Sequence, residues 1–170
     1  MIIGTAKWRK SQQGLAAVEM TLVLPLLLFL FLATAEIGRM LYQYNTLTKA
    51  QRDGARLIAA SLKYNQQAGL NECSSSTGGT LPNNLMARAA NLVVYGTEGL
   101  PDDPEPLLPG LTTANVGFCR ISGTQEVQIQ VQYNFTPMLF DELPSFGLGD
   151  PVPINFPLNS AINMKVLAGG

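Results

Sequence analysis

The sequence predicts an α+β fold in which one long N-terminal helix packs on a small antiparallel β-sheet. Two patterns support this prediction. In the N-terminal third, an apolar run is followed by apolar residues at three- and four-residue steps, which is typical of a helix. Toward the C-terminus, apolar and polar residues alternate, which is typical of strands with one buried face.

A transmembrane helix is predicted over residues 15–36. Residues 15–35 read LAAVEMTLVLPLLLFLFLATA, in which Glu19 is the single charge. At 1.5 Å per residue this run spans roughly 31 Å, about the thickness of one hydrocarbon core. Pro25 lies within the run and removes one backbone hydrogen bond, so it is the candidate site of a helix kink.

The charges around the apolar run predict its orientation in the inner membrane. Three cations precede Glu19, and Glu36 and Arg39 cancel just beyond the run. Because cations are retained on the cytoplasmic side, the N-terminus is predicted to be cytoplasmic and residues 37–170 to be periplasmic. The cations are Lys7, Arg9 and Lys10. Residues 1–14 would then be a basic leader peptide.

An ordinary secretory signal peptide is the alternative. Ala33-Thr34-Ala35 is an A-x-A site after an apolar region, and cleavage there would release a soluble periplasmic protein. The apolar run is long for a signal region, however, and the helical pattern continues past this site. Both features favour a retained membrane helix.

The helical pattern continues to residue 64, so one helix of roughly 73 Å is predicted over residues 16–64. Its apolar stripe consists of Ile37, Met40, Leu41, Tyr44, Leu47, Ala55, Ile58 and Leu62, with Gln51 as the one polar member. The polar residues mostly lie off this stripe: Arg39, Gln43, Lys49, Arg52, Arg56 and Lys63. The second half of the helix is therefore amphipathic and is predicted to pack on a periplasmic domain.

Two loops and a short helix are predicted in the middle of the chain. Residues 65–80 are polar and contain SSSTGG, so they predict a loop. Residues 82–95 predict a short helix with Pro82 near its start. Residues 96–115 contain four prolines and three clustered acids. These acids, Asp102, Asp103 and Glu105, could bind calcium, but they lack the spacing of a calcium loop and favour a solvated loop.

Three strands are predicted after residue 115. The first two strands cover residues 116–121 and 127–135 and are joined by a turn at residues 122–124. Apolar and polar residues alternate most clearly in the second of them. After a Pro- and Gly-rich excursion over residues 137–153, residues 156–166 alternate again. A three-stranded antiparallel sheet packed on an amphipathic helix is the pilin-like architecture.

The two cysteines, Cys73 and Cys119, predict a disulfide between the loop after the long helix and the first strand. An even pair in an exported domain favours a disulfide, and two free buried thiols are the alternative. The bond would close a loop of about 47 residues, which is worth about 4 kcal/mol in the chain-entropy description.

Composition argues against an enzyme and against a nucleic-acid-binding protein. There is no histidine, so His-based acid–base catalysis, Ser-His and Cys-His pairs and imidazole metal ligands are excluded. The net charge of −1 provides no field for nucleic acid. The sequence shows no phosphate-binding loop, metal-ligand cluster or internal repeat, so no cofactor, metal or small-molecule substrate is predicted.

Glu19 needs a partner because a charge in lipid costs several kcal/mol near the bilayer centre and less near its edge. A cut after Gly14 would provide one. Leu15 would become the N-terminus, and its ammonium and Glu19 would lie four residues apart on one helical face. The ammonium of an incoming subunit could equally pair with Glu19 of a neighbour, which would set the register between subunits.

The motif of a basic leader, Gly14, an apolar residue and Glu19 is similar to the cleavage site of type IV prepilins. Residues 14–60 as a whole closely resemble the TadE-like family. The recurring features of that family fall on Gly14 to Glu19, on Leu22 to Leu28, on Glu36-x-Gly38-Arg39 and on Arg52-Asp53-Gly54-Ala55-Arg56. The stretch VQIQVQYNFTP is similar, less specifically, to a strand often found there.

This resemblance implies a minor pseudopilin of the tight-adherence (Flp, type IVb, Tad) pilus machinery, which supports adhesion, biofilm formation or secretion. A prepilin peptidase would cut after Gly14. The implied partners are this peptidase, other pilin and pseudopilin subunits and the inner membrane. Two alternatives remain, an uncleaved single-pass binding or sensor protein and a soluble periplasmic binder released after Ala35.

Overall fold

The computed structural model describes residues 9–62, 66–138, 142–143, 149–155 and 157–166. The chain divides into two compact units, Met1–Arg39 and Met40–Gly170. Helix α1 (Arg9–Ser61) contributes residues to both units. The fold class is α+β, as predicted, with a long N-terminal helix and a small three-stranded antiparallel sheet.

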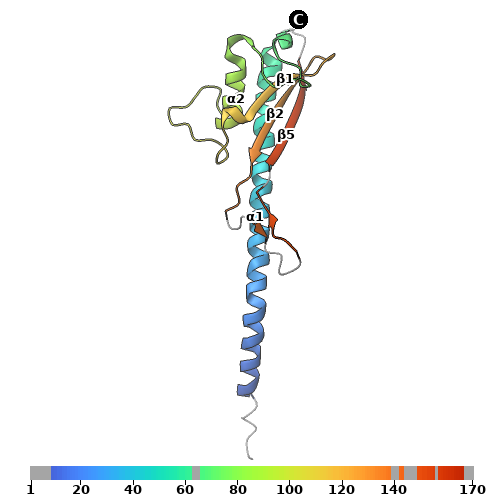
Figure 1. Cartoon of the computed structure of the whole chain (residues 1–170). Helices are drawn as coiled ribbons and strands as arrows, with labels where there is room; N and C mark the ends of the chain where they lie inside the picture. Colours follow the sequence, from blue (N-terminus) through green and yellow to red (C-terminus); the bar gives the residue numbers. More distant parts are fainter. Residues whose placement is uncertain (1–8, 63–65, 139–141, 144–148, 156, 167–170) are drawn as a thin grey trace, which may run out of the picture. The chain divides into compact units, whose positions relative to one another are not determined.

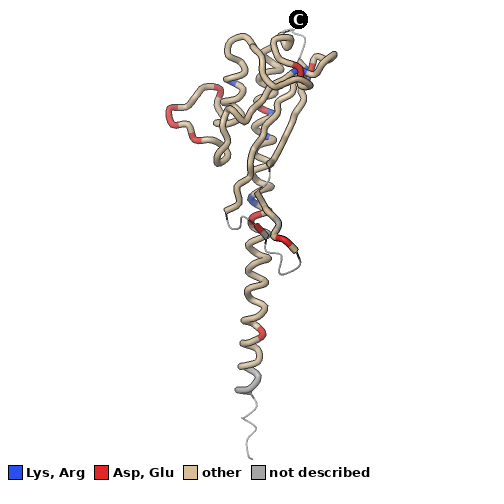
Figure 2. The backbone as a smooth tube through the Cα atoms, in the orientation of Figure 1, with Lys and Arg blue, Asp and Glu red and all other residues tan. Residues whose placement is uncertain are grey.

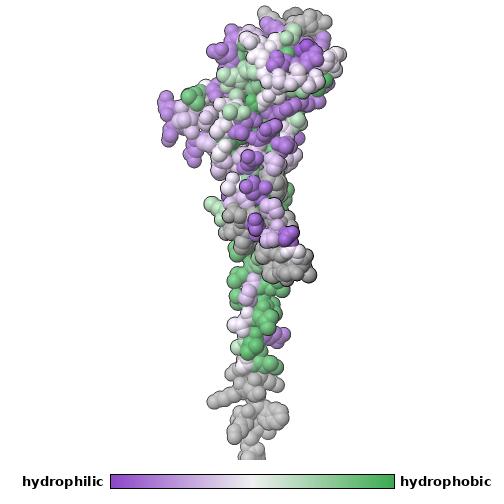
Figure 3. All heavy atoms as spheres, viewed as in Figure 1, coloured by the Kyte–Doolittle hydropathy of each residue, from purple (hydrophilic) through white to green (hydrophobic). Residues whose placement is uncertain are grey.

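The first unit contains the apolar part of α1. Its large apolar side chains are exposed from Leu15 to Phe31 except the half-buried Phe29, and Figure 3 shows this stretch mostly in the green of hydrophobic residues. The hydroxyl of Thr21 donates to the Ala17 carbonyl at 2.8 Å, and that of Thr34 donates to the Leu30 carbonyl at 2.7 Å. These polar side chains are therefore satisfied within the helix, as an apolar solvent requires.

Helix α1 continues through Pro25 and is α-helical on both sides of it. The kink predicted there stays a prediction. Within the part of the chain that the structure describes, α1 is the helix long and apolar enough to cross a membrane. It ends at Ser61, a little before the predicted end at residue 64.

In the second unit, α1 buries one face against a core made with α2 (Leu85–Tyr95) and the sheet (Figure 1). The buried residues of this part of α1 are Gln43, Leu47, Ala50, Gln51, Ala55, Ile58 and Ala59. The predicted stripe is thus right from Leu47 onward and wrong before it, because Leu41 and Tyr44 are exposed. Gln43, expected off the stripe, is buried at 6% exposure.

Helix α2 is shorter than its prediction at the N-terminal end. A 3₁₀ turn, η2 (Pro82–Asn84), precedes it, and Asn83 and Asn84 adopt positive φ angles of 56° and 52°. Asparagine tolerates this left-handed region better than most residues. At the other end, Gly96 has φ 75° and its amide donates to the Leu92 carbonyl at 3.1 Å, which closes the helix as a glycine C-cap.

The sheet has the strand order β1-β2-β5 and all its pairs are antiparallel. The strands are β1 (Val116–Arg120), β2 (Glu126–Asn134) and β5 (Pro157–Lys165), each within two residues of its prediction. The central strand β2 buries Val127, Ile129, Val131 and Tyr133, as its alternation predicted. Phe156, assigned to the last strand, lies outside the described residues.

Four further elements were not expected. A two-stranded hairpin of β3 (Glu142–Leu143) and β4 (Val152–Pro153) lies in the predicted excursion. The two predicted loops contain the 3₁₀ turns η1 (Gln66–Gly69) and η3 (Thr113–Asn115). Each strand of the hairpin has 2 residues, which is too short for an alternation of apolar and polar residues to be recognised in the sequence.

Candidate functional site

The predicted leader junction lies inside helix α1. Gly14, Leu15 and Glu19 are all helical and exposed. A Cβ atom added at Gly14 would meet nothing within 4 Å, so packing in the chain does not require glycine at this position.

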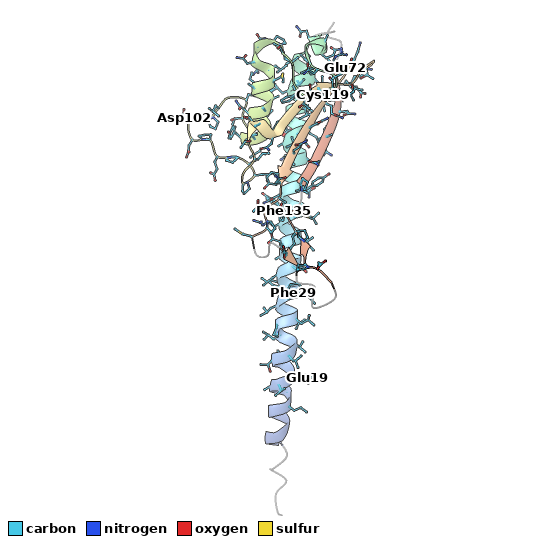
Figure 4. All side chains as sticks on the ribbon, in the orientation of Figure 1. Glu19, Phe29, Glu72, Asp102, Cys119 and Phe135 are labelled. Atoms are coloured by element: carbon cyan, nitrogen blue, oxygen red, sulfur yellow. A yellow bond between two sulfur atoms is a disulfide. The ribbon has the colours of Figure 1, made fainter. Side chains whose placement is uncertain are left out.

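Glu19 projects from the exposed apolar stretch of α1 (Figure 4). Among the described residues its carboxylate has no hydrogen bond and no ion pair. Its neighbours Leu15, Met20 and Leu22 are exposed apolar side chains. The structure thus presents a single carboxylate on an apolar surface.

The exit from the apolar stretch holds an internal ion pair. Arg39 Nη2 donates to Glu36 Oε1 at 3.1 Å, one helical turn away. The Glu36 side chain is 5% exposed and that of Arg39 is 28% exposed. Gly38 lies between them, and a Cβ there would meet nothing within 4 Å. The two charges that cancel in the sequence are therefore in contact in space.

The segment from Arg52 to Arg56 divides into a packing part and an exposed part. A Cβ at Gly54 would lie 2.7 Å from Val93 Cγ2 and 3.3 Å from the Ala89 carbonyl oxygen, so glycine lets α1 approach α2 closely. Arg52, Asp53 and Arg56 are exposed. Helical spacing would allow Asp53 to pair with Lys49 or Arg56, but none of these charges has an ion pair among the described residues.

These four groups, at Gly14, Glu19, Glu36–Arg39 and Arg52–Arg56, all lie on helix α1. The family model described as TadE-like protein matches residues 14–56, which are the residues that hold them. Over this segment the chain is similar to the TadE-like family. The resemblance stated from the sequence is confirmed, and the family suggests a protein associated with the Tad pilus and its other components. No curated protein and no solved structure matches the chain.

Beyond the TadE-like segment, the predicted disulfide is present. Cys73 and Cys119 are joined with an S–S distance of 2.08 Å, and Cys119 is fully buried in β1. Figure 4 labels Cys119 beside Glu72, which precedes Cys73 in the loop. Glu72 accepts a hydrogen bond from Arg120 Nη2 at 2.7 Å, so an ion pair lies beside the disulfide. Sequence reasoning did not find this pair, because the two residues are far apart in the chain.

The loop that carries Cys73 also covers the outer edge of β1. The amide of Cys73 donates to the Arg120 carbonyl at 3.0 Å, and the amide of Arg120 donates to the Asn71 carbonyl at 2.9 Å. Further along, the amide of Gly78 donates to the Phe118 carbonyl at 2.6 Å. The disulfide therefore holds a loop that already bonds to the strand.

The hydrogen bonds of Tyr133 were also not predicted from the sequence, which assigned this residue only to the core. Its hydroxyl donates to Gln43 Oε1 and to the Pro109 carbonyl, each at 3.1 Å. Tyr133 is 3% exposed and Gln43 is buried. One phenol thus connects β2 to α1 and to the loop after α2. The sequence pointed to Tyr133 only through the similarity of VQIQVQYNFTP to a strand often found in the TadE-like family.

The acids considered for calcium do not assemble into a ligand set. Asp102, Asp103 and Glu105 are exposed, and no group of three or more His, Cys, Asp or Glu residues in the described part of the chain could hold a metal ion.

Proposed function

We propose that this chain is a minor pseudopilin required for assembly of a Flp-type (type IVb, Tad) pilus. Residues 15–36 anchor it in the bacterial inner membrane, with the N-terminus in the cytoplasm and residues 37–170 in the periplasm. A prepilin peptidase removes residues 1–14. The observation that carries this proposal is the family match, which begins at Gly14, the residue that precedes the proposed cut.

The surroundings of Gly14 support recognition by a peptidase. The glycine is exposed, and its missing side chain answers no packing need in this chain. A protease that recognises a small residue before the cut would account for it. The basic leader then keeps the junction at the cytoplasmic face, since cations resist translocation.

The isolated carboxylate of Glu19 supports a role in subunit assembly. An uncompensated charge in lipid is costly, so a free Glu19 favours a neighbour that supplies a cation. After cleavage, the new ammonium of Leu15 on an incoming subunit is such a cation. Pairing between the two would fix the axial position of one subunit against the next, because displaced subunits would leave both charges unpaired.

The length of the apolar run supports retention of the membrane helix rather than release after Ala35. Residues 15–35 are long enough to span a hydrocarbon core and are long for a signal region. An uncleaved single-pass binding or sensor protein is the remaining alternative. It differs from the pseudopilin in the mass of the mature chain.

The test is the intact mass of the protein purified from membranes of a strain with an active prepilin peptidase. We expect an N-terminus at Leu15. An N-terminus at Met1 would instead support the uncleaved binder, and one at Glu36 the released domain. Gly14→Val should leave the leader in place, while the matched control Gly38→Val should be processed normally, because a Cβ is free of contacts at both positions.

A further inference from the structure

Helix α1 carries a solvent-facing charged strip in the second unit. The strip consists of Lys49, Arg52, Asp53 and Arg56, which share one side of the helix at three- and four-residue spacing. All four are exposed and none has an ion pair or side-chain hydrogen bond among the described residues. The packing of α1 uses Gly54 and Ala55 and does not need these charges.

A shallow groove of about 240 Å³ borders this strip. Its walls include Ala50 from α1, Leu92 and Gly96 from α2, and Leu107 from the following loop. Lys49 and Asp53 also line it, so the charged strip forms one side of the groove. A partner suited to this surface would offer one apolar side chain next to carboxylates.

The loop after α2 offers that combination. Leu100 is 66% exposed, and three exposed carboxylates follow it within five residues. These are Asp102, Asp103 and Glu105, which have no ion pair among the described residues. Figure 2 shows the red acidic positions along a loop that stands out from the second unit in this view, and Figure 4 labels Asp102 on it.

The loop is held at its base and stiffened along its length. Arg88 of α2 forms an ion pair with Glu98, and Asn91 Nδ2 donates to the Glu98 carbonyl at 3.5 Å. Pro101, Pro104 and Pro106 restrict the backbone between the acids. A loop ordered in advance loses less conformational entropy on binding.

We propose that the loop of residues 98–106 of one copy docks on the charged strip of a second copy. Leu100 would enter the groove of the second copy, and the three carboxylates would face Lys49, Arg52 and Arg56. Asp53 lies on the same strip, so three cations and one carboxylate oppose three carboxylates. The proposal needs the second unit alone and does not depend on cleavage after Gly14.

Each copy carries both the loop and the strip, and Gly96 and Leu107, which flank the loop, line the groove beside the strip. Two copies can therefore exchange this contact reciprocally in a closed pair, or repeat it head to tail in a ring or an open array. Exposed charge pairs are screened over about 10 Å at 0.1 M salt, so the association should weaken as salt is added.

The test measures self-association of the full-length chain in detergent micelles by sedimentation, at low and high salt. One variant reverses the charge of the loop (Asp102→Lys, Asp103→Lys). A second variant reverses the charge of the strip (Arg52→Glu, Arg56→Glu). Each alone should weaken association roughly tenfold or more, because like charges then face each other. Leu100→Ser should weaken it as well, whereas the control Lys165→Glu, at the end of β5, should not.

Mixing the two reversed variants decides between contact within one chain and contact between chains. The loop of each variant is then complementary to the strip of the other, so the mixture should associate more tightly than either variant alone. Far-UV circular dichroism of each variant verifies folding, and Arg52→Gln with Arg56→Gln provides a milder pair. A native chain that stays monomeric at low salt, or a mixture that is not rescued, would overturn the proposal.

Discussion

The hydroxyl of Tyr133 donates to Gln43 Oε1 at 3.1 Å across 90 residues of sequence. It also donates to the Pro109 carbonyl, so one buried group connects a strand, a helix and a loop. Removal of a buried hydroxyl leaves its acceptors without a donor, which costs about 1–3 kcal/mol.

Tyr133→Phe is therefore expected to lower the free energy of unfolding by about 1–3 kcal/mol. Urea unfolding of the full chain in micelles measures this. Tyr95→Phe is the matched control, because Tyr95 is partly buried but has no hydroxyl hydrogen bond among the described residues. Equal losses in the two variants would show that the hydrogen bonds of Tyr133 contribute nothing specific.

Gln51 should behave in the opposite way, although it is even more buried. Its Nε2 donates to the Ser160 carbonyl at 3.0 Å, but its Oε1 has no hydrogen-bond partner in the described part of the chain. Gln51→Met removes both this unsatisfied acceptor and the donor to Ser160 and keeps the volume, so the two effects offset and the free energy of unfolding should change by less than about 1 kcal/mol. A loss above about 2 kcal/mol in the same urea experiment would mean that the bond to Ser160 is essential.

Gly54→Ala is expected to destabilise the second unit by about 1 kcal/mol or more. The new Cβ would lie 2.7 Å from Val93 Cγ2, and Val93 is fully buried, so the crowding outweighs the gain of about 1 kcal/mol in helix propensity. Gly38→Ala should not destabilise the chain, since its Cβ meets nothing within 4 Å. Thermal melts of both variants should separate them, and a stabilised Gly54→Ala protein would contradict the close helix approach.

Reduction of the Cys73–Cys119 bond is expected to cost about 4 kcal/mol, because it frees a loop of 47 residues in the unfolded chain. Melting with and without dithiothreitol measures the loss. The variant Cys73→Ala with Cys119→Ala should melt at the temperature of the reduced protein and be insensitive to the reductant. If reduction left the native melting temperature unchanged, the bond would not contribute to stability.

Glu19→Gln removes the charge from the apolar surface of α1 while keeping the size of the side chain. The variant should still insert and be trimmed to Leu15, but pili should be lost because subunits no longer pair through this carboxylate. Intact mass and electron microscopy of the cells give the two readouts. Thr21→Val serves as the control, since the Thr21 hydroxyl bonds only within its own helix. Normal piliation with Glu19→Gln would rule out the pairing.

The periodic parts of the fold were predictable from the sequence, and the isolated contacts were not. The alternation along β2 and the apolar steps from Leu47 to Leu62 identified buried faces correctly, because burial repeats with the period of each element. Leu41 was misassigned because apolar residues near a membrane segment look the same whether they face lipid or a core. Gln43 was misassigned because its partner, Tyr133, lies on a distant strand.

The candidate site was predictable in its residues but not in its contacts. Glu36 and Arg39 were recognised as cancelling charges, and their ion pair at 3.1 Å follows from helical spacing. By contrast, Asp53 has the same helical spacing from Lys49 and Arg56, and the structure shows no ion pair between them among the described residues. Helical spacing permits such pairs, but exposed pairs contribute little energy and need not form.

The loop bonded along β1 has a consequence for the sheet as a whole. A strand from another molecule could join at the β1 border only by displacing backbone bonds that a covalent bridge keeps in place. Among the described residues the opposite border, β5, has no comparable cover over its nine residues. Any extension of this sheet would therefore proceed in one direction, away from the cysteines.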